Sequence, residues 1–169
     1  MPRSHRPSSP AMSFPVAAAS LLVGLLVLTG AVVEPARAPD ACALVTRAEA
    51  AAALGAPVPV GVPKAMPWVV DGHSLPADYC FYGPEVIVAR VALGPNAAAL
   101  FSRYRSSLAA KDDYGAVTGV GDEAFTAKGQ LAVRRGTVGL IVDVGQARGG
   151  GAAERAAEKQ LAQDALHRF

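Results

Sequence analysis

The spacing of hydrophobic and polar positions changes several times along the chain. In Ala97–Leu108, apolar residues recur every three or four positions, which predicts a helix with one buried face. Thr46 and Glu49 have the spacing of a capping box, so a helix is predicted to begin there and to continue to Leu54. A last helix is predicted over Ala152–Arg168.

The last helix carries a narrow apolar stripe with charged residues on both sides. The stripe consists of Ala157, Leu161, Ala165 and Leu166, and the flanking residues are Glu154, Arg155, Glu158 and Lys159. Because a helix of this kind buries one stripe only, we expect the flanking charges to lie beside the buried face.

Short β-rich segments separated by turn residues predict strands. The candidates are Lys64–Val70, Tyr79–Tyr82, Glu85–Leu93, Ala116–Val120, Glu123–Ala127, Gln130–Arg135 and Val138–Val144. Asp71–Pro76 is expected to be a loop, and Gly83-Pro84 is expected to be the turn of a hairpin. Short connections imply antiparallel pairing, so the fold class is α+β. We expect an antiparallel sheet packed by about three helices, in the outline order α-β-β-β-α-β-β-β-α.

The N-terminal 38 residues have the three parts of a secretory signal peptide. Residues 1–13 carry basic side chains and no acid, Phe14–Val33 has no charge, and Ala36-Arg37-Ala38 offers small residues at a cleavage site after Ala38. About 20 apolar residues can also span a bilayer, so Phe14–Val33 could remain as a single anchor and the only membrane contact. Either outcome makes residues 39–169 one extracytoplasmic domain.

Composition and charge narrow the classes of protein further. The chain has 169 residues, 51% of them hydrophobic, which excludes a disordered chain. Its small excess of basic residues, 16 against 14 acidic, comes from residues 1–38, which hold three Arg and one Glu. The remaining 13 basic and 13 acidic residues give a neutral domain, which predicts no nucleic-acid partner.

The only two cysteines, Cys42 and Cys80, both belong to the exported part. In an oxidising compartment such a pair most often forms a disulfide. A redox or metal-binding pair is the alternative, but it would favour C-x-x-C spacing or nearby histidines, and the sequence has neither. We therefore expect a bridge that joins the first helix to the first hairpin.

Residues that could carry chemistry are few and scattered. The sequence has no recognisable catalytic or nucleotide-binding motif, and we expect no catalytic residue, no metal site and no cofactor. The weak binding candidates are Trp68, His73, Asp122 and Glu123. His73 lies between Asp71 and Asp78, a trio that could hold a metal, although a solvated loop is the simpler interpretation.

Two further segments have a structural and a functional interpretation. Gly119–Phe125 (Gly-Val-Gly-Asp-Glu-Ala-Phe) is expected to form a structural corner, in which Asp122 closes a turn on its own backbone. The adjacent carboxylates of Asp122 and Glu123 would be a weak cation site by themselves. Residues 145–151 are expected to form a loose loop, with an anion site at Arg148 as the alternative.

Several of these motifs together resemble a known family. The similarity rests on residues 40–46 (Asp-Ala-Cys-Ala-Leu-Val-Thr), on Ala53-Leu54-Gly55, on Cys80 in an aromatic segment, and on Gly119–Phe125 followed by 131–134. In these segments the sequence is similar to the actinobacterial secreted, lipoprotein-like proteins of domain of unknown function 3558. The resemblance implies a location in the cell envelope and no known enzyme activity. Ala41 stands where those proteins usually have proline, and their usual lipobox is missing.

These observations lead to a general expectation for function. We expect a non-catalytic exported protein of the cell envelope that binds a small ligand or an envelope protein, through a sheet face or the Trp68–Tyr82 region. The alternatives are an unrecognised extracytoplasmic enzyme that uses Asp71, His73 and Asp78, or a structural partner of a membrane complex.

Overall fold

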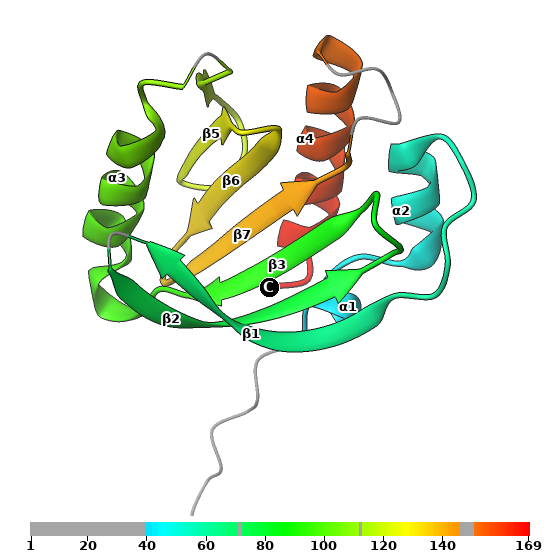
Figure 1. The fold of residues 1–169 in the computed structure, drawn as a ribbon, viewed down its shortest axis with the longest axis horizontal. Coiled ribbons are helices and arrows are strands. Elements are labelled where there is room, and N and C mark those ends of the chain that lie inside the picture. Colours follow the sequence, from blue (N-terminus) through cyan, green and yellow to red (C-terminus); the bar gives the residue numbers. More distant parts are fainter. Residues whose placement is uncertain (1–39, 71, 112, 146–150) are drawn as a thin grey trace, which may run out of the picture. The chain divides into compact units, whose positions relative to one another are not determined.

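The computed structural model describes residues 40–70, 72–111, 113–145 and 151–169 (Figure 1). The expected signal peptide or anchor, with Phe14–Val33 and the cleavage site at Ala38, lies outside the described residues. Within the described ranges, no helix has both the length and the apolar character needed to cross a bilayer.

The described domain is built on one antiparallel sheet. Its strands are β1 (Val62–Val70), β2 (His73–Phe81), β3 (Ile87–Ala92), β4 (Gly115–Val117), β5 (Glu123–Ala127), β6 (Gln130–Arg135) and β7 (Val138–Asp143). Their order across the sheet is β1-β2-β3-β7-β6-β5-β4, and every neighbouring pair is antiparallel. The sheet therefore joins a meander of three strands to a meander of four through the β3–β7 pair.

Helices cover both faces of the sheet (Figure 1). They are α1 (Ala41–Leu44), α2 (Arg47–Leu54), the 3-10 turn η1 (Gly94–Asn96), α3 (Ala97–Leu108) and α4 (Ala152–Leu166). Phe101 of α3 shares a buried cluster with Ala132 of β6, whereas Leu161 of α4 shares another with the next residue along β6, Val133. Successive residues of a strand point to opposite faces, so α3 covers one face and α4, with α1 and α2, covers the other.

The expected fold class is confirmed as α+β, and the expected order of elements agrees in outline. The structure differs from the expected order in two ways. It has the additional short helix α1, and it has four strands after α3, where the expected order has three. The capping box is present at the start of α2, where Thr46 accepts a hydrogen bond from the Glu49 backbone N–H and the Glu49 carboxylate accepts one from the Thr46 N–H.

The loop expected over Asp71–Pro76 is wrong, because β2 begins at His73. Val70 pairs with His73, so the turn is tight, and Gly72 has the positive φ of 75° that such a turn requires. Pro76 faces Pro67 of β1 and lies beyond the end of β3, whose pairing with β2 begins at Ala77. That stretch of β2 has a neighbour on one side only, and proline is tolerated at such edge positions of a sheet.

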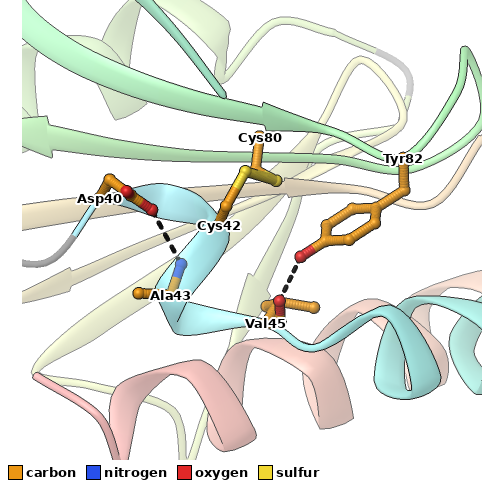
Figure 2. The surroundings of a disulfide bond; sticks show 6 residues. All are labelled: Asp40, Cys42, Ala43, Val45, Cys80 and Tyr82. Carbon is orange, nitrogen blue, oxygen red and sulfur yellow. Dashed lines mark hydrogen bonds between the residues drawn. A yellow bond between two sulfur atoms is a disulfide. The ribbon is translucent and has the colours of Figure 1, made fainter. Parts of the chain in front are cut away.

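The predicted disulfide between Cys42 and Cys80 is present and joins α1 to β2 (Figure 2). Asp40 caps α1 by accepting a hydrogen bond of 2.9 Å from the Ala43 N–H. Two residues beyond Cys80, the Tyr82 hydroxyl donates a hydrogen bond to the Val45 carbonyl (Figure 2). The bridge and this hydrogen bond hold the N-terminal helices against the sheet at neighbouring points.

We expect the bridge to contribute substantially to stability. A double variant with Cys42→Ser and Cys80→Ser should lose about 3–4 kcal/mol of unfolding free energy, because the oxidised chain closes a long loop in the unfolded state. The two cysteines are 38 residues apart. Urea unfolding of both proteins, followed by circular dichroism, measures the difference, and equal transition midpoints would contradict the expectation.

Candidate functional site

The N-terminal half of α4 buries two carboxyl groups. Glu154 is 7% exposed and Glu158 is 1% exposed, and they precede Leu161 and Ala165 on the buried side of the helix. Residues four apart occupy the same helical face, so the two glutamates extend the apolar stripe instead of lying beside it. The expectation that both lie beside the buried face is therefore wrong.

The two glutamates line a pocket of about 530 Å³. Its wall is formed by residues from the ends of β5, β6 and β7, the β5–β6 turn, α4, the β2–β3 and α3–β4 connections and the residues that flank β7 and α4: Pro84, Asp113, Thr126, Lys128, Gly129, Gln130, Asp143, Gly145, Gly151, Glu154, Arg155 and Glu158. This volume is in the range of small-molecule sites and is much larger than a single ion needs. We call it the acidic pocket.

One oxygen of each glutamate is buried without a partner. Oε2 of Glu154 and Oε1 of Glu158 make no hydrogen bond with the part of the chain that the structure describes. A buried polar atom without a partner costs about 1–3 kcal/mol, and more if it is charged. Folding therefore leaves an unsatisfied acceptor on each of two residues that line the pocket.

Burial raises the pKa of the Glu158 carboxyl from 4.5 to about 8. Desolvation is the main cause, and the neighbouring charges of Glu154 and Asp143 add to it. The backbone hydrogen bond with Val144 and the guanidinium of Arg155 lower this pKa, but each has a smaller effect than desolvation and the charge of Glu154. Glu158 is therefore mostly protonated at pH 7, and a cation beside it would favour its ionised form.

The residue types in the acidic pocket suit an organic cation better than a metal ion. The described residues contain no group of three His, Cys, Asp or Glu that could hold a metal. Asp113 and Asp143 already accept hydrogen bonds from the backbone N–H groups of Gly129 (2.7 Å) and Gly145 (2.8 Å). Glu154 and Glu158 each have a buried oxygen without a partner among the described residues, and their carboxylates could bind a protonated amine as charge-assisted hydrogen-bond partners.

Two of the sequence-predicted candidates, Asp122 and Glu123, have a structural role. Arg134 of β6 forms ion pairs with Asp122 (2.8 Å) and Glu123 (3.0 Å), and Arg105 of α3 lies 3.5 Å from Glu123. Asp122 also accepts a hydrogen bond of 2.8 Å from the Gly136 N–H in the β6–β7 turn. Its carboxylate thus connects the corner to a neighbouring turn, and the two acids already have cationic partners.

Trp68 and His73 do not form a site together. Trp68 packs edge to face against Tyr104 of α3, with 4.6 Å between the ring centroids. His73 is exposed and lies five residues before Asp78 on the same strand, so the two side chains point to opposite faces of the sheet. Asp78 lies 4.0 Å from Arg90 instead. The third member of the expected trio, Asp71, lies outside the described residues.

The alternative anion site at Arg148 also lies outside the described residues. The described residues on either side of that segment, Gly145 and Gly151, belong to the acidic pocket. The sequence did contain a signal for this pocket, because Glu154 and Glu158 have the same helical spacing as the apolar stripe that follows them. Their charge predicts a position beside the buried face, but their spacing places both glutamates on that face.

Comparisons with known proteins give no relative. No family model matches the chain, and neither a curated protein nor a solved structure matches it. The resemblance to the secreted, lipoprotein-like proteins described above therefore stays a prediction.

The corner at Asp122 yields a prediction about glycine. Gly121 and Gly136 have nearly the same positive φ, 58° and 57°, but only Gly121 is crowded. A Cβ on Gly121 would lie 2.5 Å from the Arg134 carbonyl oxygen, whereas one on Gly136 would meet no atom within 4 Å. We expect Gly136→Ala to cost about 1–2 kcal/mol from backbone strain, and Gly121→Ala to cost about 1–3 kcal/mol more from the clash. Thermal or urea unfolding measures both variants. Equal losses of unfolding free energy would contradict the prediction, because they would show that the neighbouring atoms move to make room for the Cβ at Gly121.

The buried carboxyl of Glu158 yields a pH-dependent prediction. Because its folded pKa of about 8 exceeds 4.5, the folded protein binds more protons than the unfolded chain between these values. Its contribution to stability therefore falls as the pH rises from about 4.5 to about 8. Glu158→Gln has no ionisable group at this position and therefore avoids the loss. Its free energy of unfolding, relative to that of the wild type, should rise by up to about 1.4 kcal/mol for each pH unit in this window.

Urea unfolding at pH 5, 7 and 9 measures this difference. Asp164→Asn is a matched control, since it removes a carboxylate from the same helix outside the acidic pocket. Parallel pH curves for the wild type and Glu158→Gln would contradict the raised pKa.

Proposed function

We propose that the protein is an exported, non-catalytic domain of the cell envelope that binds a small organic cation in the acidic pocket. One observation carries the proposal: Glu158 lines a pocket of about 530 Å³, is 1% exposed and has a carboxyl oxygen without a partner among the described residues. A carboxyl group in that position destabilises the empty domain. A bound cation would offset the cost by supplying both charge and hydrogen-bond donors.

Export is supported by two independent features. The N-terminal residues have the order of a signal peptide, basic, apolar and then small. The domain itself carries the Cys42–Cys80 disulfide, a bond that persists mainly in oxidising compartments.

Binding, without catalysis, is supported by where the reactive residue types lie. His73 is exposed on one face of the sheet, and Asp78 belongs to the other. Asp122 and Glu123 are held in ion pairs. The free carboxyl groups of the acidic pocket are on α4, a rigid helix packed against β6 and β7. A rigid wall with unsatisfied acceptors favours recognition of a positively charged group.

The proposal predicts pH-dependent binding of simple amines. The n-alkylamines from propylamine to hexylamine remain protonated up to pH 9, so the ionisation of Glu158 controls the interaction. If the cation binds the ionised carboxylate, affinity should rise by up to roughly two orders of magnitude between pH 6 and pH 9. Titration calorimetry on protein produced from the full chain measures the affinity at each pH.

Two variants make this experiment specific. Glu158→Gln should weaken binding at pH 9 at least about tenfold, the loss of one charge-assisted interaction, and should abolish the pH dependence. Asp164→Asn removes a charge from the same helix and should bind as the wild type does. Absence of amine binding at every pH, or equal binding by Glu158→Gln, would overturn the proposed function.

A further inference from the structure

We infer that the ligand of the acidic pocket is a zwitterion, a small molecule with an ammonium group at one end and a carboxylate at the other. This inference rests on the proposed function, because it assumes that the ammonium group binds at Glu154 and Glu158. It adds the chemistry of the other end of the ligand, which is set by two basic residues in the pocket wall.

Among the residues that the structure describes, Lys128 and Arg155 are the two basic ones that line the acidic pocket. Both residues are exposed, in contrast to the two buried glutamates. Neither forms an ion pair within 4.0 Å among the described residues. The exposed part of the wall thus carries these two basic side chains together with Asp113, whose carboxylate accepts a hydrogen bond from the Gly129 N–H, whereas the two glutamates are buried.

The position of Lys128 is fixed by the fold. It lies in the two-residue turn between β5 and β6, where Ala127 pairs with Gln130. The Asp113 carboxylate accepts a hydrogen bond of 2.7 Å from the Gly129 N–H and holds this turn. Arg155 is equally constrained at its backbone, since it belongs to the first turns of α4 beside Glu154. The two cations are therefore attached to two different elements that line the pocket, the β5–β6 turn and α4.

This arrangement discriminates between a simple amine and a zwitterion. A ligand with only an ammonium group meets like charge at Lys128 and Arg155, which opposes its binding. A carboxylate at the far end of the ligand would turn this repulsion into attraction, and each exposed pair of opposite charges is worth about 0.2–1 kcal/mol. We expect the two pairs together to favour the zwitterion by about 2- to 30-fold.

The test compares two series of ligands that share one end. The ω-amino acids from 3-aminopropanoate to 6-aminohexanoate have the same chain and ammonium group as propylamine to hexylamine, and they end in a carboxylate instead of a methyl group. Calorimetry at pH 9 and low salt should show at least one ω-amino acid binding more tightly than its matched amine. The length at which the preference is greatest reports the distance between the two ends of the site.

Variants of the basic residues identify the source of the preference. The double variant Lys128→Gln/Arg155→Gln should remove the advantage of each ω-amino acid over its matched alkylamine, a ratio measured within one protein at one pH. The charge-reversed variant Lys128→Glu/Arg155→Glu should invert the preference, so that amines bind more tightly than ω-amino acids. A control double variant, Lys64→Gln/Arg103→Gln, removes two exposed cations from β1 and α3, outside the pocket, and should keep the wild-type preference.

The outcomes separate this inference from the proposed function. If the alkylamines bind as tightly as the ω-amino acids and the Lys128 and Arg155 variants change nothing, the zwitterion inference is wrong and the cation site stands. If neither series binds, the proposed function fails and the inference fails with it. Thermal unfolding of each variant, with a midpoint equal to that of the wild type, shows that a loss of preference does not arise from unfolding.

Discussion

The pairing of β3 with β7 is the constraint on which the rest of the domain depends. Six residue pairs, from Ile87 with Asp143 to Ala92 with Val138, join the two meanders into one sheet (Figure 1). The partners are about fifty residues apart in sequence, so the pair forms only at a considerable cost in chain entropy. Both faces of β3 and β7 are buried, and helices α3 and α4 cover opposite faces.

The two ends of α4 make different contacts with the rest of the domain. At the C-terminal end, Arg168 donates hydrogen bonds to the Leu44 carbonyl (2.7 Å) and to Glu49 (2.6 Å), which ties the chain end to the N-terminal helices. The disulfide holds those helices on β2. At the N-terminal end, α4 turns Glu154 and Glu158 toward the sheet, where the apolar stripe would otherwise continue. The helix is therefore anchored at the end remote from the acidic pocket, and the pocket end carries the unsatisfied groups.

Burial of Glu158 costs stability that an apolar residue at the same position would not cost. Natural proteins tolerate local violations of packing rules where a site requires them, and the rest of the structure compensates. In this domain the compensation comes from two buried clusters, one on each face of the sheet, together with the bridge between α1 and β2. In the acidic pocket, two carboxyl groups are buried at positions of a helix where packing favours apolar residues. This conflict with the packing rule is the reason for proposing a function there.

The sequence by itself determined the local elements. The capping box at Thr46, the β2–β3 turn and the disulfide partners follow from residue types at short spacing, and so does the α+β class. The start of β2 differs from the prediction because the turn residues within Asp71–Pro76 favour a loop, and only the pairing of strands shows that His73 to Pro76 extend β2 along β1. The β3–β7 pair and the burial of Glu158 were decided by tertiary structure alone. Local spacing identifies a strand or a helical face, but which distant strand pairs with it, and what covers that face, depends on contacts that the local pattern does not encode.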